Sequence, residues 1–358
     1  MKNNRRTFIK SLGLASVGAA TGISISSARA EKVKWKMVTS WPKNFPGLGA
    51  GAETLASYIN QLSGGSLKVK VFGANELVPP LGVFDYVSSG GAEMGHSGAY
   101  YWKGKTAAAQ FFSSVPFGMT AQEMNSWLYY GNGLQLWEKV YEKFNLVPRA
   151  AGNTGVQMGG WFNKEINSAD DLKGLKMRIP GLGGEVLARA GGTPFTLAGA
   201  EIFTSLQTGV IDATEWVGPY NDRAFGLHKA AKFNYYPGWH EPGPSLECII
   251  NKEAYMSLSK VHQKVIDLSC KAANIDMISD YMSKNYQALE FFKKEKVQIK
   301  QFPKEVLIKL KNISKDVLKD LSTTDPISKE VFDSYSNFLN SVRPWTILSE
   351  DSYLNSTK

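Results

Sequence analysis

Cysteine and histidine are scarce in this chain of 358 residues, which has two cysteines and four histidines. The histidines are far apart and form no Cys/His cluster with the spacing of a zinc site. No G-x-S-x-G segment marks a nucleophile of the α/β-hydrolase type, and the "GLGG" segment at 181–184 does not continue into the G-x-G-x-x-G pattern of dinucleotide sites. The sequence therefore gives no support to these three classes of site. The four histidines are His96, His228, His240 and His262.

Acidic residues are missing from the first thirty positions, which end in "SLGLASVGAATGISISSARA". Arg5 and Arg6, followed by an apolar stretch and by an A-x-A sequence ending at Ala30, resemble a twin-arginine export signal. We predict that residues 1–30 are a signal peptide cleaved after Ala30 and that the mature protein is periplasmic. A retained anchor helix is the alternative, but the apolar stretch is short and rich in Gly, Ala and Ser for spanning a bilayer.

A strong basic excess is also missing from the mature chain. The N-terminal segment carries five cationic side chains and no acid, so its removal lowers the formal net charge from +9 to +4. A surplus this small, spread over a long chain, gives no basic stripe of the kind that nucleic-acid binding needs, and we expect no nucleic-acid partner. Cys248 and Cys270 either pair in an oxidising compartment or remain buried thiols, and both readings stay open.

Short strand patterns and short helix patterns alternate along the chain. Apolar residues alternate in 33–37 and then recur at helical spacing in 52–62, where Gly64 and Gly65 end the helix. The same order returns in the second half, for example in "AEIFTSLQTGVIDATEW". Repeated βα units predict an α/β fold with parallel strands and helices on both faces. The length predicts two lobes, because single cores stop growing at about 250–300 residues.

The last third of the chain has helical patterns only. From Asn251 to about Ile299 there is no proline and no glycine, which predicts one long helix that braces both lobes. Two amphipathic helices follow, in 306–321 and 331–342. Their apolar faces must be buried, either on the protein's own lobes or in a dimer interface.

Three segments resemble the periplasmic solute-binding subunit of the tripartite (TRAP) transporters, of the DctP type. The E-W-V-G-P and W-x-E-P-G sequences in the third segment are most similar to the branch of that family that binds 2-oxo acids such as pyruvate. The segments are "SWPKNFPGLGAGAETLASYINQLSGG", "DLKGLKMRIPGLGGEVLARAGGTP" and "GVIDATEWVGPYNDRAFGLHKAAKFNYYPGWHEPG".

The resemblance implies the two-lobed periplasmic binding protein fold with a long bracing helix and a C-terminal helical extension. It further implies a homodimer in which helices are exchanged between subunits, and a membrane permease as partner. The predicted parts are lobe I at 31–155 with part of 244–285, lobe II at 156–243 with part of 286–305, and the C-terminal dimerisation extension at 306–358.

Five motif positions carry the roles that the resemblance implies. Arg178 in "MRIPG" matches the arginine that clamps the ligand carboxylate, and Gln157 matches a glutamine after the first crossover. The Glu215-Trp216 pair and Glu241 match the group that holds a cation and the ligand. One difference is His240, which stands directly before Glu241 where the resemblance implies an aromatic residue.

The residue types suit these roles. A guanidinium matches a carboxylate with two parallel N–H donors, which a lysine cannot do. Glu215, Glu241, the Gln157 amide oxygen and the Trp216 carbonyl are hard oxygen ligands, which suit Na⁺ or Ca²⁺. Without the resemblance, a surface arginine and two separate surface ion pairs would be the simpler reading. Two further candidates for a hydrogen bond to the ligand from lobe I are Asn153 and Tyr101.

The sequence thus predicts a binding protein and not an enzyme. It is expected to capture a small 2-oxo monocarboxylate, with Na⁺ or Ca²⁺ in the site, and to pass it to a membrane permease. Oxygen atoms on adjacent carbons of the acid would chelate the ion. A binder of 2-hydroxy acids or larger carboxylates is the first alternative, and a metal-dependent periplasmic enzyme is the second.

Overall fold

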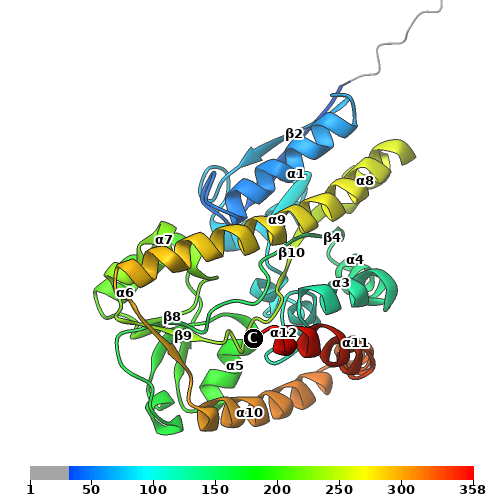
Figure 1. Cartoon of the computed structure of the whole chain (residues 1–358). Helices are drawn as coiled ribbons and strands as arrows, with labels where there is room; N and C mark the ends of the chain where they lie inside the picture. The colour runs from blue at the N-terminus through cyan, green and yellow to red at the C-terminus, as the bar shows by residue number, and fades with distance from the viewer. Residues whose placement is uncertain (1–31) are drawn as a thin grey trace, which may run out of the picture. The chain divides into compact units, whose positions relative to one another are not determined.

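The computed structural model describes residues 32–358, so the signal peptide expected at 1–30 lies outside the described residues. Two β-sheets, each covered by helices, form two lobes, and a long helix runs along both (Figure 1). The predicted two-lobed α/β fold is therefore confirmed. Within the described residues, no helix combines the length and the apolar character needed to cross a bilayer.

The first sheet builds lobe I. Its second strand alternates strictly, because Leu67, Val69 and Val71 are buried while the lysines between them are exposed. This alternation sets the parallel register with the first strand, in which Val33 pairs with Leu67. The sheet order is β2-β1-β3-β10-β4, with β1 (Val33–Thr39), β2 (Leu67–Phe72), β3 (Met94–Ser97), β4 (Leu146–Asn153) and β10 (Ser245–Asn251).

The second sheet builds lobe II from shorter strands. Its order is β11-β9-β5-β8-β6-β7, with β5 (Gly160–Phe162), β6 (Lys176–Arg178), β7 (Thr193–Phe195), β8 (Ala213–Thr214), β9 (Phe233–Tyr236) and β11 (Gln298–Gln301).

The prediction of parallel strands is wrong for β5 and β10. Each is the first strand that the chain forms after it crosses from one lobe to the other. β10 runs antiparallel to β3 and β4, and β5 runs antiparallel to β8 and β9. The register pairs Ser245, where β10 begins, with Asn153, where β4 ends. A strand that arrives from the partner lobe starts where its neighbours end, so it must run in the opposite direction.

Helices cover both sheets. In lobe I, α1 packs between β2 and the long helix α9 (Lys260–Lys294), while α4 packs against α3, β4 and the 107–112 turn. In lobe II, α5 lies against β7 and α6 against β8. The helices of the two lobes are α1 (Leu48–Leu62), α2 (Val83–Ser88), α3 (Ala121–Tyr130), α4 (Gly133–Glu142), α5 (Gly181–Arg189), α6 (Gly199–Gln207) and α7 (Pro219–Phe225).

The predicted long helix is two helices, α8 (Lys252–Ser257) and α9 (Lys260–Lys294). The break comes at Leu258, which has an extended backbone, and at Ser259, whose side chain accepts a hydrogen bond from the backbone of His262 and caps α9. The bracing role holds for α9, which contacts α1 and β4 in lobe I and α7 in lobe II. The sequence prediction overlooked Ser259, whose capping side chain marks the start of α9.

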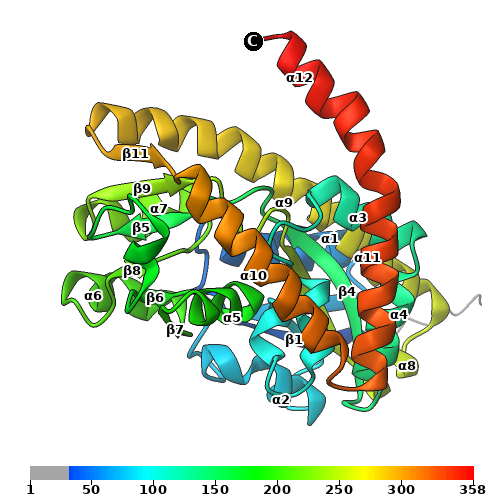
Figure 2. The same ribbon diagram turned by 90° about the horizontal axis from the view of Figure 1, so that it is seen from below.

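The C-terminal helices pack on the protein's own lobes along most of their length. α10 (Lys304–Ser322) lies on α5, and α11 (Pro326–Thr346) returns to α3, α4 and the 107–112 turn (Figure 2). Their predicted apolar faces are buried at Val306, Leu310, Val331 and Tyr335. Beyond α11, a π-helical turn and α12 (Ser352–Ser356) extend away from the rest of the described chain.

Cys248 and Cys270 are both buried as free thiols in the lobe I core, one on β10 and the other on α9. Of the two readings that the sequence left open, the structure has the buried thiols.

A carboxyl group is buried in the interior of lobe I. Glu247 on β10 has no exposed surface and accepts hydrogen bonds from the Trp102 indole and, at 2.9 Å, from the Tyr141 hydroxyl. Burial raises the pKa of Glu247 from 4.5 to about 7, although both hydrogen bonds act in the opposite direction. Between these two pH values the folded protein holds a proton that the unfolded chain releases, so stability falls as pH rises.

We expect Glu247→Gln to make the fall of stability between about pH 4.5 and 7 shallower than in the wild type, because it removes one buried carboxyl group with a raised pKa and leaves Asp222 and Glu241. At pH 8 its free energy of unfolding should exceed that of the wild type by up to about 3 kcal/mol, because one pKa unit corresponds to about 1.4 kcal/mol. A glutamine keeps an oxygen for Trp102 and an amide for Tyr141. Denaturant unfolding across this pH range measures the effect, with the exposed Glu253→Gln as control; parallel curves for wild type and Glu247→Gln would contradict it.

Candidate functional site

Two adjacent parallel strands of lobe II bring a buried arginine and a buried glutamate together. Arg178 ends β6 and pairs in register with Thr214, the last residue of β8, so Glu215 follows directly at the same sheet edge. The Arg178 guanidinium donates to Glu215 Oε1, and the backbone N–H of Glu215 donates to the Arg178 carbonyl at 3.1 Å. Each of the two side chains is only 1% exposed, so water hardly screens this ion pair.

Arg178 also reaches lobe I. Its Nη2 donates to the Tyr101 hydroxyl at 3.1 Å, and its Nε donates to the Leu197 carbonyl at 3.2 Å. The Trp216 ring lies over the guanidinium, with its centroid 5.0 Å from Cζ. Tyr101 lies in a 3₁₀ turn at 99–102 that follows β3 of lobe I. The guanidinium therefore stands at the junction of the two lobes.

The other candidate residues lie on the two segments that connect β4 to β5 and β9 to β10. The backbone N–H of Gln157 donates to the Glu241 carbonyl at 3.2 Å, and that of Gly238 donates to the Gln157 carbonyl at 2.9 Å. A Cβ atom at Gly238 would lie 2.2 Å from the Gln157 carbonyl oxygen. Glycine at this position therefore lets the "GWHE" turn press against the first connection and sets Glu241 beside Gln157.

Several polar atoms at this junction are buried without a hydrogen-bond partner among residues 32–358. They include one oxygen each of Gln157, Glu215 and Glu241, and both ring nitrogens of His240. Glu215, His240 and Glu241 each present a potential ligand atom, and these three atoms lie within 4.8 Å of one another. Buried polar atoms are normally satisfied, so this set is suited to contact a ligand or an ion.

The electrostatics also favour a cation. Burial, and next the negative charge of Glu215, raise the pKa of Glu241 well above its usual range. Two buried carboxylates at this separation are costly unless a positive charge lies between them. Arg178 already neutralises one of the two. The free oxygens of Glu215, Glu241 and Gln157 fit the donor set of Na⁺ or Ca²⁺.

The structure brings most of the predicted residues together and leaves one apart. The side chain of Asn153 donates to the Gly243 carbonyl at 3.1 Å and accepts from the Gly155 N–H at 2.8 Å, so its amide joins the two connecting segments. Sequence reasoning assigned no role to His240, although its place directly before Glu241 was the signal. The residues that the structure does gather are Tyr101, Gln157, Arg178, Glu215, Trp216 and Glu241.

Side chains of both lobes pack beside the site. Trp41 and Phe45 of lobe I contact Trp216 with ring centroids 6.4 and 6.2 Å apart, and Phe45 lies 4.3 Å from the Phe225 ring. These contacts enclose the site on the side of α7. The charged and amide groups behind them are at most 5% exposed, so the described conformation is a closed one.

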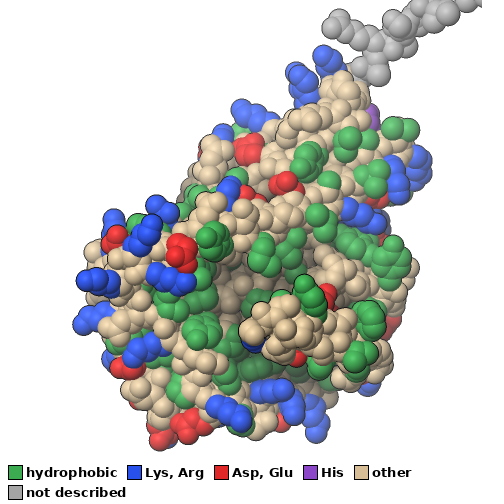
Figure 3. Space-filling view, viewed as in Figure 1, with side chains coloured by type: hydrophobic (Ala, Val, Ile, Leu, Met, Phe, Trp, Pro, Cys, Tyr) green, Lys and Arg blue, Asp and Glu red, His purple; other side chains and the backbone are tan. Residues whose placement is uncertain are grey.

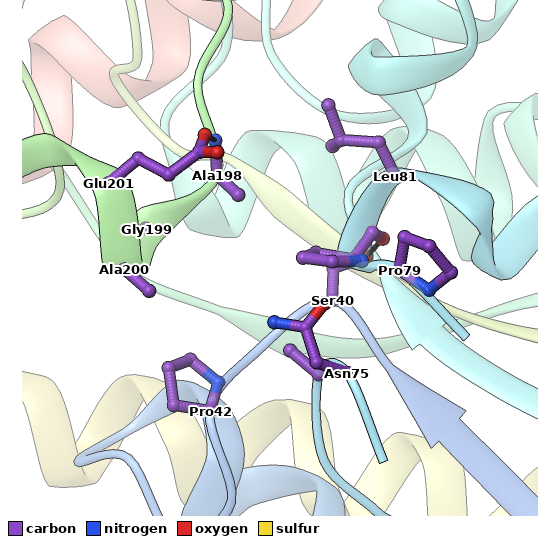
Figure 4. Close-up of a pocket in the computed structure, with 11 residues that line it drawn as sticks. Ser40, Pro42, Asn75, Pro79, Leu81, Ala198, Gly199, Ala200 and Glu201 are labelled. Atoms are coloured by element: carbon purple, nitrogen blue, oxygen red, sulfur yellow. Dashed lines mark hydrogen bonds between the residues drawn. The ribbon is translucent and has the colours of Figure 1, made fainter. Parts of the chain in front are cut away.

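A pocket of about 400 Å³ opens between the lobes next to this closed site (Figure 4). Ser40 and Pro79 line it from lobe I, and the start of α6 at 198–201 faces them from lobe II. Residue 198 follows Leu197, whose carbonyl holds Arg178. The pocket therefore lies along the edge where the lobes meet. Its lining in lobe II begins one residue after Leu197, the backbone contact of Arg178.

Comparison with known proteins gives a consistent result. The model of the family described as bacterial extracellular solute-binding protein, family 7, matches residues 37–324. A curated relative, a monocarboxylate 2-oxoacid-binding periplasmic protein of Nostoc sp., is 42% identical over 335 residues, which are 94% of this chain and 92% of the relative.

Two solved structures are similar in sequence and in fold. A TRAP periplasmic solute-binding protein from Colwellia psychrerythraea, with bound calcium and pyruvate, is 43% identical with a TM-score of 0.89, and the match covers 91% of this chain and 100% of that one. A TRAP periplasmic solute-binding protein from Pseudoalteromonas atlantica, with bound sodium and pyruvate, is 40% identical with a TM-score of 0.89, covering 91% and 99%.

We expect Glu241→Gln to keep or raise the stability of the ion-free protein and to weaken its stabilisation by cations. The substitution removes one of two buried like charges, so the ion-free variant should melt at the same temperature as the wild type or higher. It also removes a charged ligand, so Ca²⁺ affinity should fall by about 10- to 100-fold, the equivalent of ~1.5–3 kcal/mol. Thermal unfolding with increasing Ca²⁺ or Na⁺ measures both effects.

The exposed Glu142→Gln in lobe I is the matched control and should respond to cations like the wild type. An unchanged cation response in Glu241→Gln would remove this glutamate from the proposed donor set.

Proposed function

Because the chain belongs to family 7 of the bacterial extracellular solute-binding proteins, we propose that it captures a small 2-oxo monocarboxylate such as pyruvate in the periplasm, together with a cation. It then delivers the acid to the membrane permease of a TRAP transporter. The observation that carries this proposal is the buried Arg178, which stands beside a set of polar atoms that lack partners among the described residues.

Arg178 is the group that binds the carboxylate. In the closed structure its N–H donors are held by Glu215, Tyr101 and a backbone carbonyl. A ligand carboxylate exchanges with part of this set and gains two charge-assisted hydrogen bonds in a site with little water. The Trp216 ring, 5.0 Å from the guanidinium, forms an apolar wall that suits a small acid.

The cation is held by Gln157, Glu215, Glu241 and the Trp216 carbonyl. The relatives from Colwellia and Pseudoalteromonas, which contain calcium and sodium with pyruvate, support both ions as candidates. The 2-oxo oxygen and one carboxylate oxygen of the acid lie on adjacent carbons and can bind the same ion. A 2-hydroxy acid offers the same two oxygens and is the first alternative.

Ligand entry requires the lobes to separate, because the site residues are buried and come from both lobes and both connections. We place one moving body at 31–155 and the other at 156–243, as the sequence predicted. Of the chain that follows, part of 244–285 moves with the first body and part of 286–305 with the second. Asn153, whose amide joins the two connecting segments, acts at this hinge and does not touch the acid. Closure then excludes water and strengthens the Arg178 contact.

Calorimetric titration of the metal-stripped protein with pyruvate tests the proposal. We expect tight binding only with added Na⁺ or Ca²⁺. Arg178→Lys should weaken pyruvate binding by about 10- to 100-fold, because a lysine replaces a planar pair of donors with a point charge. The acid recovered afterwards should be chemically unchanged.

Arg189→Lys on the exposed side of α5 is the matched control and should bind pyruvate like the wild type. Unchanged affinity in Arg178→Lys would refute the clamp, and a converted ligand would favour the metal-dependent enzyme. Lactate and a longer 2-oxo acid, titrated in parallel, decide between the substrate classes.

We also propose that the protein is a homodimer that uses its C-terminal arm, residues 345–356. The arm is helical and carries five large hydrophobic side chains that are about half or more exposed: Trp345, Ile347, Leu348, Tyr353 and Leu354. Such side chains are rarely left in water on a helix that projects from its own fold.

The arm projects from the face on which α9 lies, and hydrophobic side chains are scattered over this face (Figure 3). Leu268, Ile275 and Met282 are exposed on α9 at intervals of seven residues, with Tyr286 one turn further. The arm of a second copy would find an apolar stripe there, as an isologous interface requires.

Leu348→Glu combined with Leu354→Glu should convert the dimer to a monomer, because two charges would enter an apolar interface. Light scattering after size-exclusion chromatography measures the mass, and pyruvate binding should be retained. Leu62→Glu, at an equally exposed leucine on α1, serves as the control. A monomeric wild type, or a dimer that survives the double substitution, would rule out the arm as the interface.

A further inference from the structure

A side-chain hydrogen bond joins α7 of lobe II to the turn that begins α1 of lobe I. Asn221 on α7 has no exposed surface, and its Nδ2 donates to the Pro46 carbonyl at 2.8 Å. Its Oδ1 accepts from the Tyr281 hydroxyl on α9 at 2.6 Å. The nitrogen and the oxygen of this amide are therefore both used, and the nitrogen bonds across the boundary between the lobes.

The position of Asn221 is fixed because α7 lies against the long helix α9 (Figure 1). The backbone N–H of Tyr220 donates to the side-chain oxygen of Asn285 at 2.9 Å, and the Tyr220 ring packs edge-on against the Tyr281 ring. Since an amide has its donors on one side and its acceptor on the other, the Tyr281 hydroxyl at Oδ1 turns the N–H donors of Asn221 towards lobe I.

The lobe I side of the contact is shaped for a close approach. Gly47 has a φ of 67°, and a Cβ atom there would lie 2.4 Å from the Tyr281 hydroxyl oxygen, so glycine is needed on both grounds. On the other side of Pro46, the Phe45 ring lies 4.3 Å from the Phe225 ring of α7. The hydrogen bond is therefore enclosed in a packed contact, where a carbonyl without its donor is costly.

This contact is separate from the groups proposed to hold the acid and the ion, since neither Pro46 nor Tyr281 belongs to that set. Separation of the lobes must nevertheless break the bond from Asn221 to Pro46, because the two residues belong to different lobes. Water can then hydrogen-bond both groups in the open form. An interaction made only in the closed form stabilises that form relative to the open one.

We propose that Asn221 is a latch, a positioning residue that holds the closed form and thereby sets how long the acid stays bound. The inference rests on the capture by lobe closure proposed above, and it adds a residue that acts through closure without touching the acid or the ion. A contact that forms after the acid has entered changes the dissociation rate far more than the association rate.

Stopped-flow measurement of pyruvate dissociation in the presence of Ca²⁺ tests the latch. Asn221→Ala should release pyruvate about 10- to 100-fold faster, because its closed form leaves a buried carbonyl and a buried hydroxyl without partners. The association rate should change by less than about threefold, because the acid enters the open form. Tyr281→Phe keeps the ring but frees the Asn221 amide to turn, and it should speed release by about two- to tenfold.

Asn251→Ala is the matched control. Asn251 is 5% exposed, its Nδ2 donates to the Val87 carbonyl at 3.0 Å, and its Oδ1 accepts from the Ala254 N–H at 3.1 Å. The amide is thus used in the same way as that of Asn221, but all of these residues lie in lobe I. This control should lose thermal stability and keep the wild-type dissociation rate.

Lobe closure itself gives a second readout. Spin labels on Leu77→Cys in lobe I and Thr204→Cys on α6 of lobe II would stand at exposed positions on the two sides of the pocket of Figure 4, outside its lining. The native cysteines are buried and should not take the label. Pulsed electron paramagnetic resonance then measures the distance between the lobes, and Asn221→Ala should enlarge the share of long distances.

A wild-type dissociation rate in Asn221→Ala would overturn the inference, and so would an equally large acceleration in Asn251→Ala. If Asn221→Ala does not fold, Tyr281→Phe decides alone, and unchanged release in that variant overturns the inference. If the wild type binds pyruvate and Asn221→Ala changes neither rate nor distance, the latch fails while the proposed function stands. If the wild type takes up no 2-oxo acid with any ion but Asn221→Ala still lengthens the distance, the latch stands and the proposed function fails.

Discussion

The buried ion pair between Arg178 and Glu215 is the interaction around which the rest of the site is arranged. A guanidinium with 1% exposure must be compensated, and β6 and β8 achieve this by ending side by side at one sheet edge. Glu215 uses one oxygen for the arginine and directs the other towards His240 and Glu241. A single carboxylate therefore links the proposed anion-binding group to the proposed cation-binding set.

In the function proposed above, this arrangement couples ligand, ion and lobe movement. Tyr101 comes from lobe I, Arg178 from lobe II, and Gln157 and Glu241 from the connections between them. Separating the lobes takes Tyr101 away from the guanidinium. The donors come from both lobes and from the connections, so a bound acid and ion that contact all of them would favour the closed form.

Local patterns predicted much of this protein correctly. Strand alternation in β2 and helical spacing in α1, α10 and α11 depend on neighbouring residues, so they can be read directly from the chain. The antiparallel direction of β5 and β10 was missed because it follows from the path between lobes. Asn153 was expected at the ligand, whereas its side-chain amide bonds to the two connecting segments, a contact that spacing along the chain does not reveal.

The amino-acid sequence by itself determined the residue types of the site, the family and the α/β class, because motifs and periodicity are local properties. Only the tertiary structure decided which of those residues meet. Arg178 and Glu215 are 37 positions apart, and the strand order, not the spacing, makes them neighbours. The contact between His240 Nε2 and Glu215 Oε2, 3.5 Å apart, was decided in the same way, because the fold and not the spacing brings the two side chains together.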